Sequence, residues 1–202
     1  MKQLDLGASV VHWLGEAARA LSEIDADAVA RAAELLMATR RQGNTIFVAG
    51  NGGSAATASH LALDLQKAAR APNGAGTRAI SLVDNAGLIT AWGNDTTFDR
   101  VFAEQLEALA RRGDALVVIS VSGNSPNLLA LLQSARCLGL VTVGLLGRSG
   151  GAARTLVDAA VLVPSEDYGW VETAHVALHH VLTYALRASA AGPARPVVTS
   201  EP

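Results

Sequence analysis

A chain of 202 residues is long enough for one domain with an additional pair of helices. Half of the residues are apolar and the net charge at pH 7 is -2, so the composition excludes a disordered chain and offers no basic field for nucleic acid. The apolar runs are too short to span a bilayer, the first residues lack a signal-peptide pattern, and the lone cysteine, Cys137, excludes an intramolecular disulfide. We therefore expect a cytoplasmic protein that binds neither nucleic acid nor a membrane.

The N-terminal region favours two helices, at 8–24 and 25–41, because apolar residues recur there at helical spacing. Asp25 is the expected N-cap of the second helix. We interpret residues 1–42 as a helical hairpin that belongs to the same unit as the domain that follows it.

From residue 43 onward, short apolar runs alternate with helical patterns. We expect strands at 45–49, 78–82, 115–120, 141–146 and 159–163, and helices at 54–67, 86–92, 98–110, 127–138, 152–156 and 171–188. Continuous apolar strands between helices are typical of a parallel sheet covered on both faces. The sequence therefore predicts an α/β three-layer sandwich over residues 43–188, followed by a disordered tail at 189–202.

Ligands of such sheets bind beyond the carboxyl ends of the strands, so the loops after Ala49 and Ser120 are of most interest. The first loop reads Gly50-Asn51-Gly52-Gly53-Ser54, and we expect Ser54 to be the N-cap of the next helix. Glycine amides at a helix N-terminus suit an anion, although a tight turn explains the glycines equally well. The spacing fits neither a P-loop nor a dinucleotide fingerprint, which disfavours a nucleotide-dependent oxidoreductase.

The second loop, residues 120–127, reads Ser-Val-Ser-Gly-Asn-Ser-Pro-Asn and also opens a helix. Hydroxyls and backbone amides without a lysine suit a phosphate monoester that must be held and later released. Helix capping by Ser125 or Asn127 explains one of these residues but not the whole cluster.

Four segments in order resemble the phosphoheptose isomerases, which are SIS-domain proteins: GNGGSAATASH, Asn94-Asp95, SVSGNSPN and VPSEDYGWVETAHVALHH. The similarity runs from about Ile46 to Leu186, and two helices in front also fit that family. The resemblance implies a flavodoxin-like SIS fold, a homotetramer, and an aldose–ketose isomerase that converts sedoheptulose 7-phosphate to D-glycero-D-manno-heptose 7-phosphate through an enediol. The alternative that the family allows is a non-catalytic sugar-phosphate-binding regulator or adaptor.

The resemblance also implies roles for individual residues. Asp64 and His180 would be catalytic, and His60, Asp64, Glu172 and His180 would hold one Zn²⁺ per subunit. The substrate would be bound by Asn51, Gly52, Gly53, Ser54, Asn94, Asp95, Ser120, Ser122, Ser125 and Glu172. Four positions depart from the family, which has glutamate at Asp64, glutamine at Glu172 and arginine at Ala68 and Trp170, and these changes suggest a divergent substrate.

The spacing of the candidate residues supports part of this assignment. His60 and Asp64 are separated by four residues and share one helical face, and imidazole with carboxylate suits Zn²⁺. Glu172 and His180 are about 12 Å apart along a helix axis. We therefore expect either that the site draws on two subunits or that Glu172 precedes the last helix. His179 is interpreted as an exposed residue, and a second metal pair with His175 stays open.

Overall fold

The computed structural model describes residues 5–70 and 76–190, and it contains one parallel sheet of five strands. The strands are β1 (Ile46–Gly50), β2 (Ala79–Ser81), β3 (Ala115–Ser120), β4 (Val141–Gly147) and β5 (Ala159–Val163), in the spatial order β2-β1-β3-β4-β5. This is the flavodoxin-like order of a doubly wound sheet. The predicted α/β sandwich is therefore confirmed.

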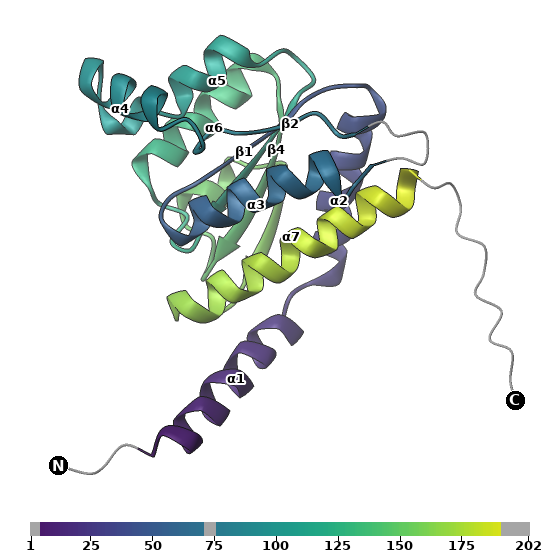
Figure 1. Ribbon diagram of the computed structural model, residues 1–202, viewed down its shortest axis with the longest axis vertical. Helices are drawn as coiled ribbons and strands as arrows, with labels where there is room; N and C mark the ends of the chain where they lie inside the picture. The colour runs from purple at the N-terminus through teal and green to yellow at the C-terminus, as the bar shows by residue number, and fades with distance from the viewer. Residues whose placement is uncertain (1–4, 71–75, 191–202) are drawn as a thin grey trace, which may run out of the picture.

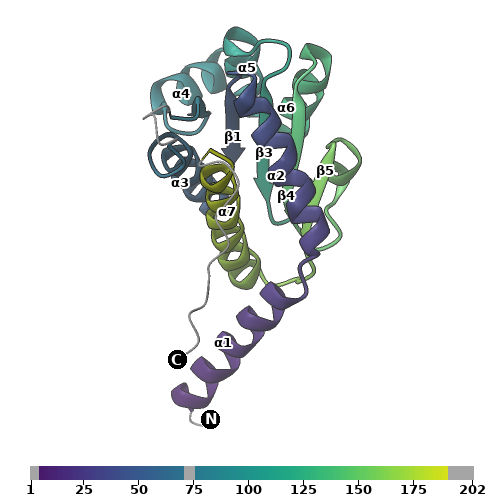
Figure 2. The same cartoon turned by 90° about the vertical axis from the view of Figure 1, so that its right-hand side faces the viewer.

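Helices cover both faces of the sheet (Figures 1 and 2). One face carries α2 (Ala26–Arg41), α3 (Gly53–Lys67) and α7 (Tyr168–Ala190), and the other carries α4 (Ala86–Asp95), α5 (Ala103–Leu109) and α6 (Pro126–Leu138), with short turns η1 (Phe98–Arg100) and η2 (Ala152–Thr155). Every residue of β1 and β3 is buried. Along β1, Ile46 and Val48 enter one core while Phe47 and Ala49 enter the other, since successive side chains of a strand point to opposite faces.

The first two helices do not form the predicted hairpin. The first helix, α1 (Leu6–Ser22), packs along α7 and extends beyond the body of the domain, nearly end to end with α2 (Figures 1 and 2). Asp25 caps α2 as expected, because its carboxylate accepts hydrogen bonds from the backbone N–H of Asp27 and Ala28. The fold leaves the apolar face of α1 largely uncovered, so that Val11 is 71% exposed.

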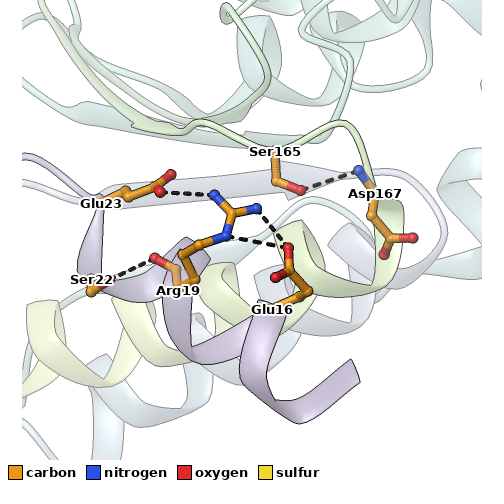
Figure 3. Close-up of polar contacts among 6 residues, drawn as sticks. All are labelled: Glu16, Arg19, Ser22, Glu23, Ser165 and Asp167. Atoms are coloured by element: carbon orange, nitrogen blue, oxygen red, sulfur yellow. Dashed lines mark hydrogen bonds and ion pairs between the residues drawn. The ribbon is translucent and has the colours of Figure 1, made fainter. Parts of the chain in front are cut away.

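The middle of α1 lies beside the start of α7, where the ring centroids of His12 and Trp170 are 6.4 Å apart. Near the C-terminal end of α1, Arg19 pairs with Glu16 at 2.7 Å and with Glu23 at 2.8 Å. Figure 3 draws these ion pairs and, separately, the hydrogen bond that the Asp167 N–H donates to Ser165 Oγ in the connection from β5 to α7. The Asp167 carboxylate accepts a hydrogen bond from the backbone N–H of Trp170 and so caps the start of α7. The exposed ion pairs add little stability, so the packing of α1 on α7 depends mainly on apolar contact.

Three predicted boundaries near the candidate site are wrong. The helix α3 begins at Gly53 and is capped by Gly52, whose φ of 56° favours glycine, so Ser54 lies inside the helix and is not its N-cap. The helix α7 begins at Tyr168, so Glu172 lies within it and does not precede it. This helix continues to Ala190, two residues into the expected tail, and residues 191–202 lie outside the described residues. In the described part of the chain no helix is long and apolar enough to cross a membrane.

Candidate active site

The two glycine- and serine-rich loops lie beside each other because β1 and β3 are neighbours in the sheet. Their helices, α3 and α6, cover opposite faces, which makes this edge the switch point where doubly wound sheets bind ligands. The side-chain amides of Asn51 and Asn127 join the loops through two reciprocal hydrogen bonds of 2.9 Å each. The pair fixes the two loops relative to each other.

A cavity of about 120 Å³ lies between these loops. The residues that line it include Asn51, Ser54, Ser120, Ser122, Ser125, Tyr168 and Glu172. Two of the hydroxyls also shape their own loop, since Ser120 Oγ accepts a hydrogen bond from the Gly123 N–H and Ser122 Oγ accepts one from the Asn124 N–H. The structure thus brings together Ser120, Ser122 and Ser125, which are predicted to bind the phosphate, and Ser54, which is predicted to bind the substrate.

The carboxylate of Glu172 lies against the first turn of α3. A Cβ atom added at Gly53 would be 2.5 Å from a carboxylate oxygen of Glu172, so only glycine leaves room for this side chain in its present position. The loop glycine therefore serves the contact between α3 and α7 as well as the turn. The same contact places a negative charge beside the serine cavity, which Glu172 also lines.

About three turns farther along α3, a cluster of imidazoles surrounds Asp64. The Asp64 Oδ2 atom lies 3.7 Å from His60 Nε2, 3.4 Å from His179 Nε2 and 3.5 Å from His180 Nδ1. The three rings pack on one another, with centroids 3.8 to 5.2 Å apart. Within the described residues, each of these histidines offers a ring nitrogen within 4.8 Å of the other two. The donor set suits Zn²⁺ or a similar ion.

His179 forms the buried side of this cluster, so its interpretation as an exposed residue is wrong. Its side chain has no exposed surface, whereas His60 is 47% and His180 is 55% exposed. Burial, together with the neighbouring imidazoles, lowers the pKa of His179 to about 4, so its ring is neutral near pH 7. A neutral imidazole is the form that binds a metal.

The structure does not gather every predicted residue. His175 is fully buried, its pKa is lowered by burial to about 4, and it does not belong to the imidazole cluster, so a second metal pair of His175 with His179 stays a prediction. Asn94 and Asp95 are exposed at the end of α4 and hydrogen-bonded to each other at 2.9 Å. Neither of them lines the cavities at the serine loops or around His60.

Sequence reasoning missed several residues that the structure places at the site. A hollow of about 460 Å³ is shared by His60 and Glu172, and Trp13 of α1 borders it. Tyr168 lines the serine cavity, and Asn127 braces it. For His179 alone the sequence offered a signal of a role at the site, because it is adjacent to His180 and four residues after His175.

Comparisons with known proteins agree with this arrangement. A sequence model of the SIS domain matches residues 12–147. The phosphoheptose isomerase of Trichlorobacter lovleyi is 44% identical over 154 residues, which are 76% of this chain and 78% of the relative. That of Pelobacter propionicus is 47% identical over 151 residues, or 75% and 79% of the two chains. The solved phosphoheptose isomerase of Neisseria gonorrhoeae superposes with a TM-score of 0.83 at 32% identity, over 90% of this chain and 98% of the other.

The parallel sheet with its serine- and glycine-rich loops belongs to a SIS domain, whose family model matches residues 12–147. The identity extends over about three quarters of the chain. The chain belongs to the phosphoheptose isomerase family within the SIS-domain proteins.

Proposed function

We propose that this protein is an aldose–ketose isomerase that converts sedoheptulose 7-phosphate to D-glycero-D-manno-heptose 7-phosphate. Its curated relatives and the solved structures that resemble it at 28–32% identity are phosphoheptose isomerases. These relatives favour an enzyme over a non-catalytic regulator or adaptor. The departures at Asp64 and Glu172 leave a carboxylate at the first position and a hydrogen-bonding side chain at the second.

One observation carries the proposal: the serine cavity and the imidazole cluster lie along the same helix, α3. Ser54 in its first turn lines the cavity, and His60 and Asp64 follow about 9 and 15 Å farther along the axis. A phosphate held by the serines leaves the carbon chain of the sugar to extend toward Asp64. Binding at a remote phosphate then supplies the orientation that the reaction at the other end requires.

The reaction moves one proton between adjacent carbons. We assign Asp64 as the base that takes a proton from C1 of the ketose while the C2 carbonyl oxygen gains a proton, which gives the enediol. Return of a proton to C2 and loss of the proton from the C1 hydroxyl then produce the aldehyde. His180 lies 3.5 Å from Asp64 and is the group we assign to the oxygen protons.

The same cluster suits a zinc ion, one per subunit. His60 and His180 would hold it, and Asp64 lies within reach of both. When bound, such an ion polarises a carbonyl oxygen. The Glu172 side chain, from α7, lies against Gly53 in the first turn of α3. We therefore assign it to substrate binding and not to the ligands of the ion.

Proton NMR of purified protein with sedoheptulose 7-phosphate, with and without added Zn²⁺, tests the function. We expect an aldoheptose 7-phosphate to appear, and we expect conversion to stop in Asp64→Asn and His180→Ala. The exposed carboxylate Glu34, on α2, provides the matched control Glu34→Gln, which should retain activity. Conversion that persists in Asp64→Asn would contradict the assignment of the base.

We further propose that the protein is a homo-oligomer, as the family resemblance suggests a tetramer. The apolar face of α1 supports this, since Leu6, Val11 and Leu14 are 67, 71 and 58% exposed. We propose that the same apolar face of a second subunit covers it. Sedimentation velocity should show an assembly that Val11→Glu dissociates. A monomeric wild-type protein would contradict this proposal.

A cytoplasmic location stays a prediction that rests on the single cysteine.

A further inference from the structure

Trp13, on α1, borders the hollow beside His60, and the proposed function gives it no role. The two helices that form the rest of the hollow each contribute residues three, four and seven positions apart, from Gly53 to His60 on α3 and from Gly169 to Val176 on α7. Residues at these intervals share one face of a helix. Trp13 is therefore the third wall of a hollow whose other two walls are the facing sides of α3 and α7.

The first turn of α7 fixes the position of the indole. A Cβ atom added at Gly169 would be 3.4 Å from Trp13 Cζ2 and 3.8 Å from Trp13 Nε1, so the ring packs against the backbone of this glycine. The preceding residue of α1, His12, meets Trp170 edge to face. Ala17, one turn later on the same face of α1, is buried. The indole is thus held at the hollow while the residue stays 40% exposed.

The hollow is the space left for the carbon chain of a sugar phosphate. Its volume is about 460 Å³, whereas the serine cavity, which suits the phosphate, has about 120 Å³. The two spaces meet at Glu172, which lines both, and at the adjacent residues Gly53 and Ser54. A ligand that is anchored at the serines therefore extends into a space that Trp13 and His60 both border.

We propose that Trp13 is a specificity-determining residue of the substrate site, and that its indole packs against the carbon chain of the phosphorylated sugar. The C–H groups of such a chain are apolar, and an aromatic ring removes them from water while its N–H can donate a hydrogen bond to a hydroxyl. The inference rests on the proposed function for the identity of the sugar, but not for the binding of its chain.

The wall opposite the indole offers the acceptors that sugar hydroxyls need. Thr173 Oγ1 donates its proton to the Gly169 carbonyl oxygen at 2.8 Å and so keeps a lone pair for a ligand. The Glu172 carboxylate, which borders the same hollow, adds acceptor oxygens. One apolar ring and a few polar groups on the facing wall are typical of a small-molecule site.

An aromatic wall in this place selects for the length of the ligand. Inorganic phosphate fills the serine cavity alone and gains nothing from Trp13, whereas each carbon that reaches the indole adds apolar contact. One methylene in an apolar pocket changes discrimination by about 10- to 200-fold. Phosphate binding and chain selection thus belong to different elements, the loops after β1 and β3 for the first and α1 for the second.

Titration calorimetry with heptitol 7-phosphate, the product of reducing sedoheptulose 7-phosphate, tests the proposal. This ligand has no carbonyl group and cannot isomerise, so its binding is measured apart from turnover. We expect Trp13→Ala to weaken its binding about 10- to 100-fold, the usual loss when an aromatic anchor is truncated. The affinity for inorganic phosphate should stay within about threefold of wild type, because the serine cavity is a separate contact.

Two further variants serve as controls. Trp13→Phe keeps an aromatic ring and should retain most of the affinity for heptitol 7-phosphate. Arg19→Ala removes an exposed, ion-paired side chain from the same helix and should bind both ligands like wild type. Unchanged binding of heptitol 7-phosphate by Trp13→Ala, or an equal loss for this ligand and inorganic phosphate, would overturn the proposal.

Fluorine NMR of the protein labelled with 5-fluorotryptophan gives an answer even where Trp13→Ala fails to fold. The resonance of Trp13, identified by its loss in Trp13→Phe, should shift with heptitol 7-phosphate and stay in place with inorganic phosphate. A resonance that responds to neither ligand, or to both alike, would contradict the contact. Binding of heptitol 7-phosphate at Trp13 without turnover of sedoheptulose 7-phosphate would support this inference and count against the proposed function alone.

Discussion

Asn51 and Asn127 exchange two side-chain hydrogen bonds of 2.9 Å across 76 residues of sequence. Each amide uses one donor and one acceptor in the pair and keeps a second of each for other partners. Asn127 is buried in the first turn of α6, so the pair is shielded from water. The relative position of the glycine-rich and serine-rich loops therefore depends on this contact.

Replacement of Asn127 with leucine should destabilise the protein and weaken substrate binding. The change leaves the amide of Asn51 without its partner, which costs about 1–3 kcal/mol for a buried polar group. The free energy of unfolding in urea and the KM for the sugar phosphate measure the two effects. Unchanged values for both would show that the loops hold their positions without the pair.

The hydroxyl of Ser125 should act on binding and not on stability. Ser125 is the N-cap residue of α6 but its side chain makes no capping hydrogen bond, and it lines the serine cavity. Loss of a hydrogen bond to a charged group costs about 1.5–3 kcal/mol, so Ser125→Ala should raise KM roughly 10- to 100-fold. The control Ser149→Ala, at an exposed loop position, should leave KM unchanged. An equal rise in the control would contradict a specific role for Ser125.

Removal of the negative charge at Glu172 should tighten phosphate binding. Its carboxylate lines the same cavity as Ser54 and Ser122 and repels a phosphate dianion there. We expect Glu172→Gln to lower the dissociation constant of inorganic phosphate about tenfold at low ionic strength, and by less in high salt, because mobile ions screen the repulsion. Titration calorimetry at two salt concentrations measures the change, and weaker binding by Glu172→Gln would reverse the assignment.

Acid should destabilise the metal-free protein through His175. Its pKa is lowered by burial from the ordinary 6.5 to about 4 in the folded protein, so the unfolded chain binds a proton more readily. The stability from this residue is complete above pH 6.5 and is lost between pH 6.5 and about 4, by up to about 3 kcal/mol. His175→Leu should show a flatter pH dependence of the free energy of unfolding at fixed protein concentration. A slope equal to that of wild type would show that other groups cause the acid sensitivity.

The sequence predicted most of the fold because the relevant signals are local. Apolar runs such as 115–120 and 159–163 match their strands at both ends, since the strands of a parallel sheet covered on both faces are nearly continuously apolar. Boundaries at α3 and α7 were less accurate. Their starts depend on the backbone conformation of Gly52 and on the cap from Asp167, and neither follows from hydrophobic spacing.

The predicted pairing of α1 with α2 failed for a different reason. Both helices have an apolar face, and periodicity alone cannot tell which partner each face meets. The short link at Asp25 permits a hairpin or a continuation, and the packing of α1 along α7 favours the continuation. The arrangement of α1 and α2 therefore depends on the tertiary structure, because the position of α7 is set by contacts with α3 and the sheet.

The candidate site shows the same division between local and tertiary information. Residue types and order by themselves determined that two glycine- and serine-rich loops, the candidate anion sites, follow β1 and β3 and that His60 and Asp64 share a helical face. Only the tertiary structure decided that His179 is buried between His60 and Asp64, that Glu172 lies against Gly53, and that Asn127 pairs with Asn51. These contacts join residues 76 to 119 positions apart, and such contacts depend on how helices pack across the sheet, which no local sequence pattern encodes.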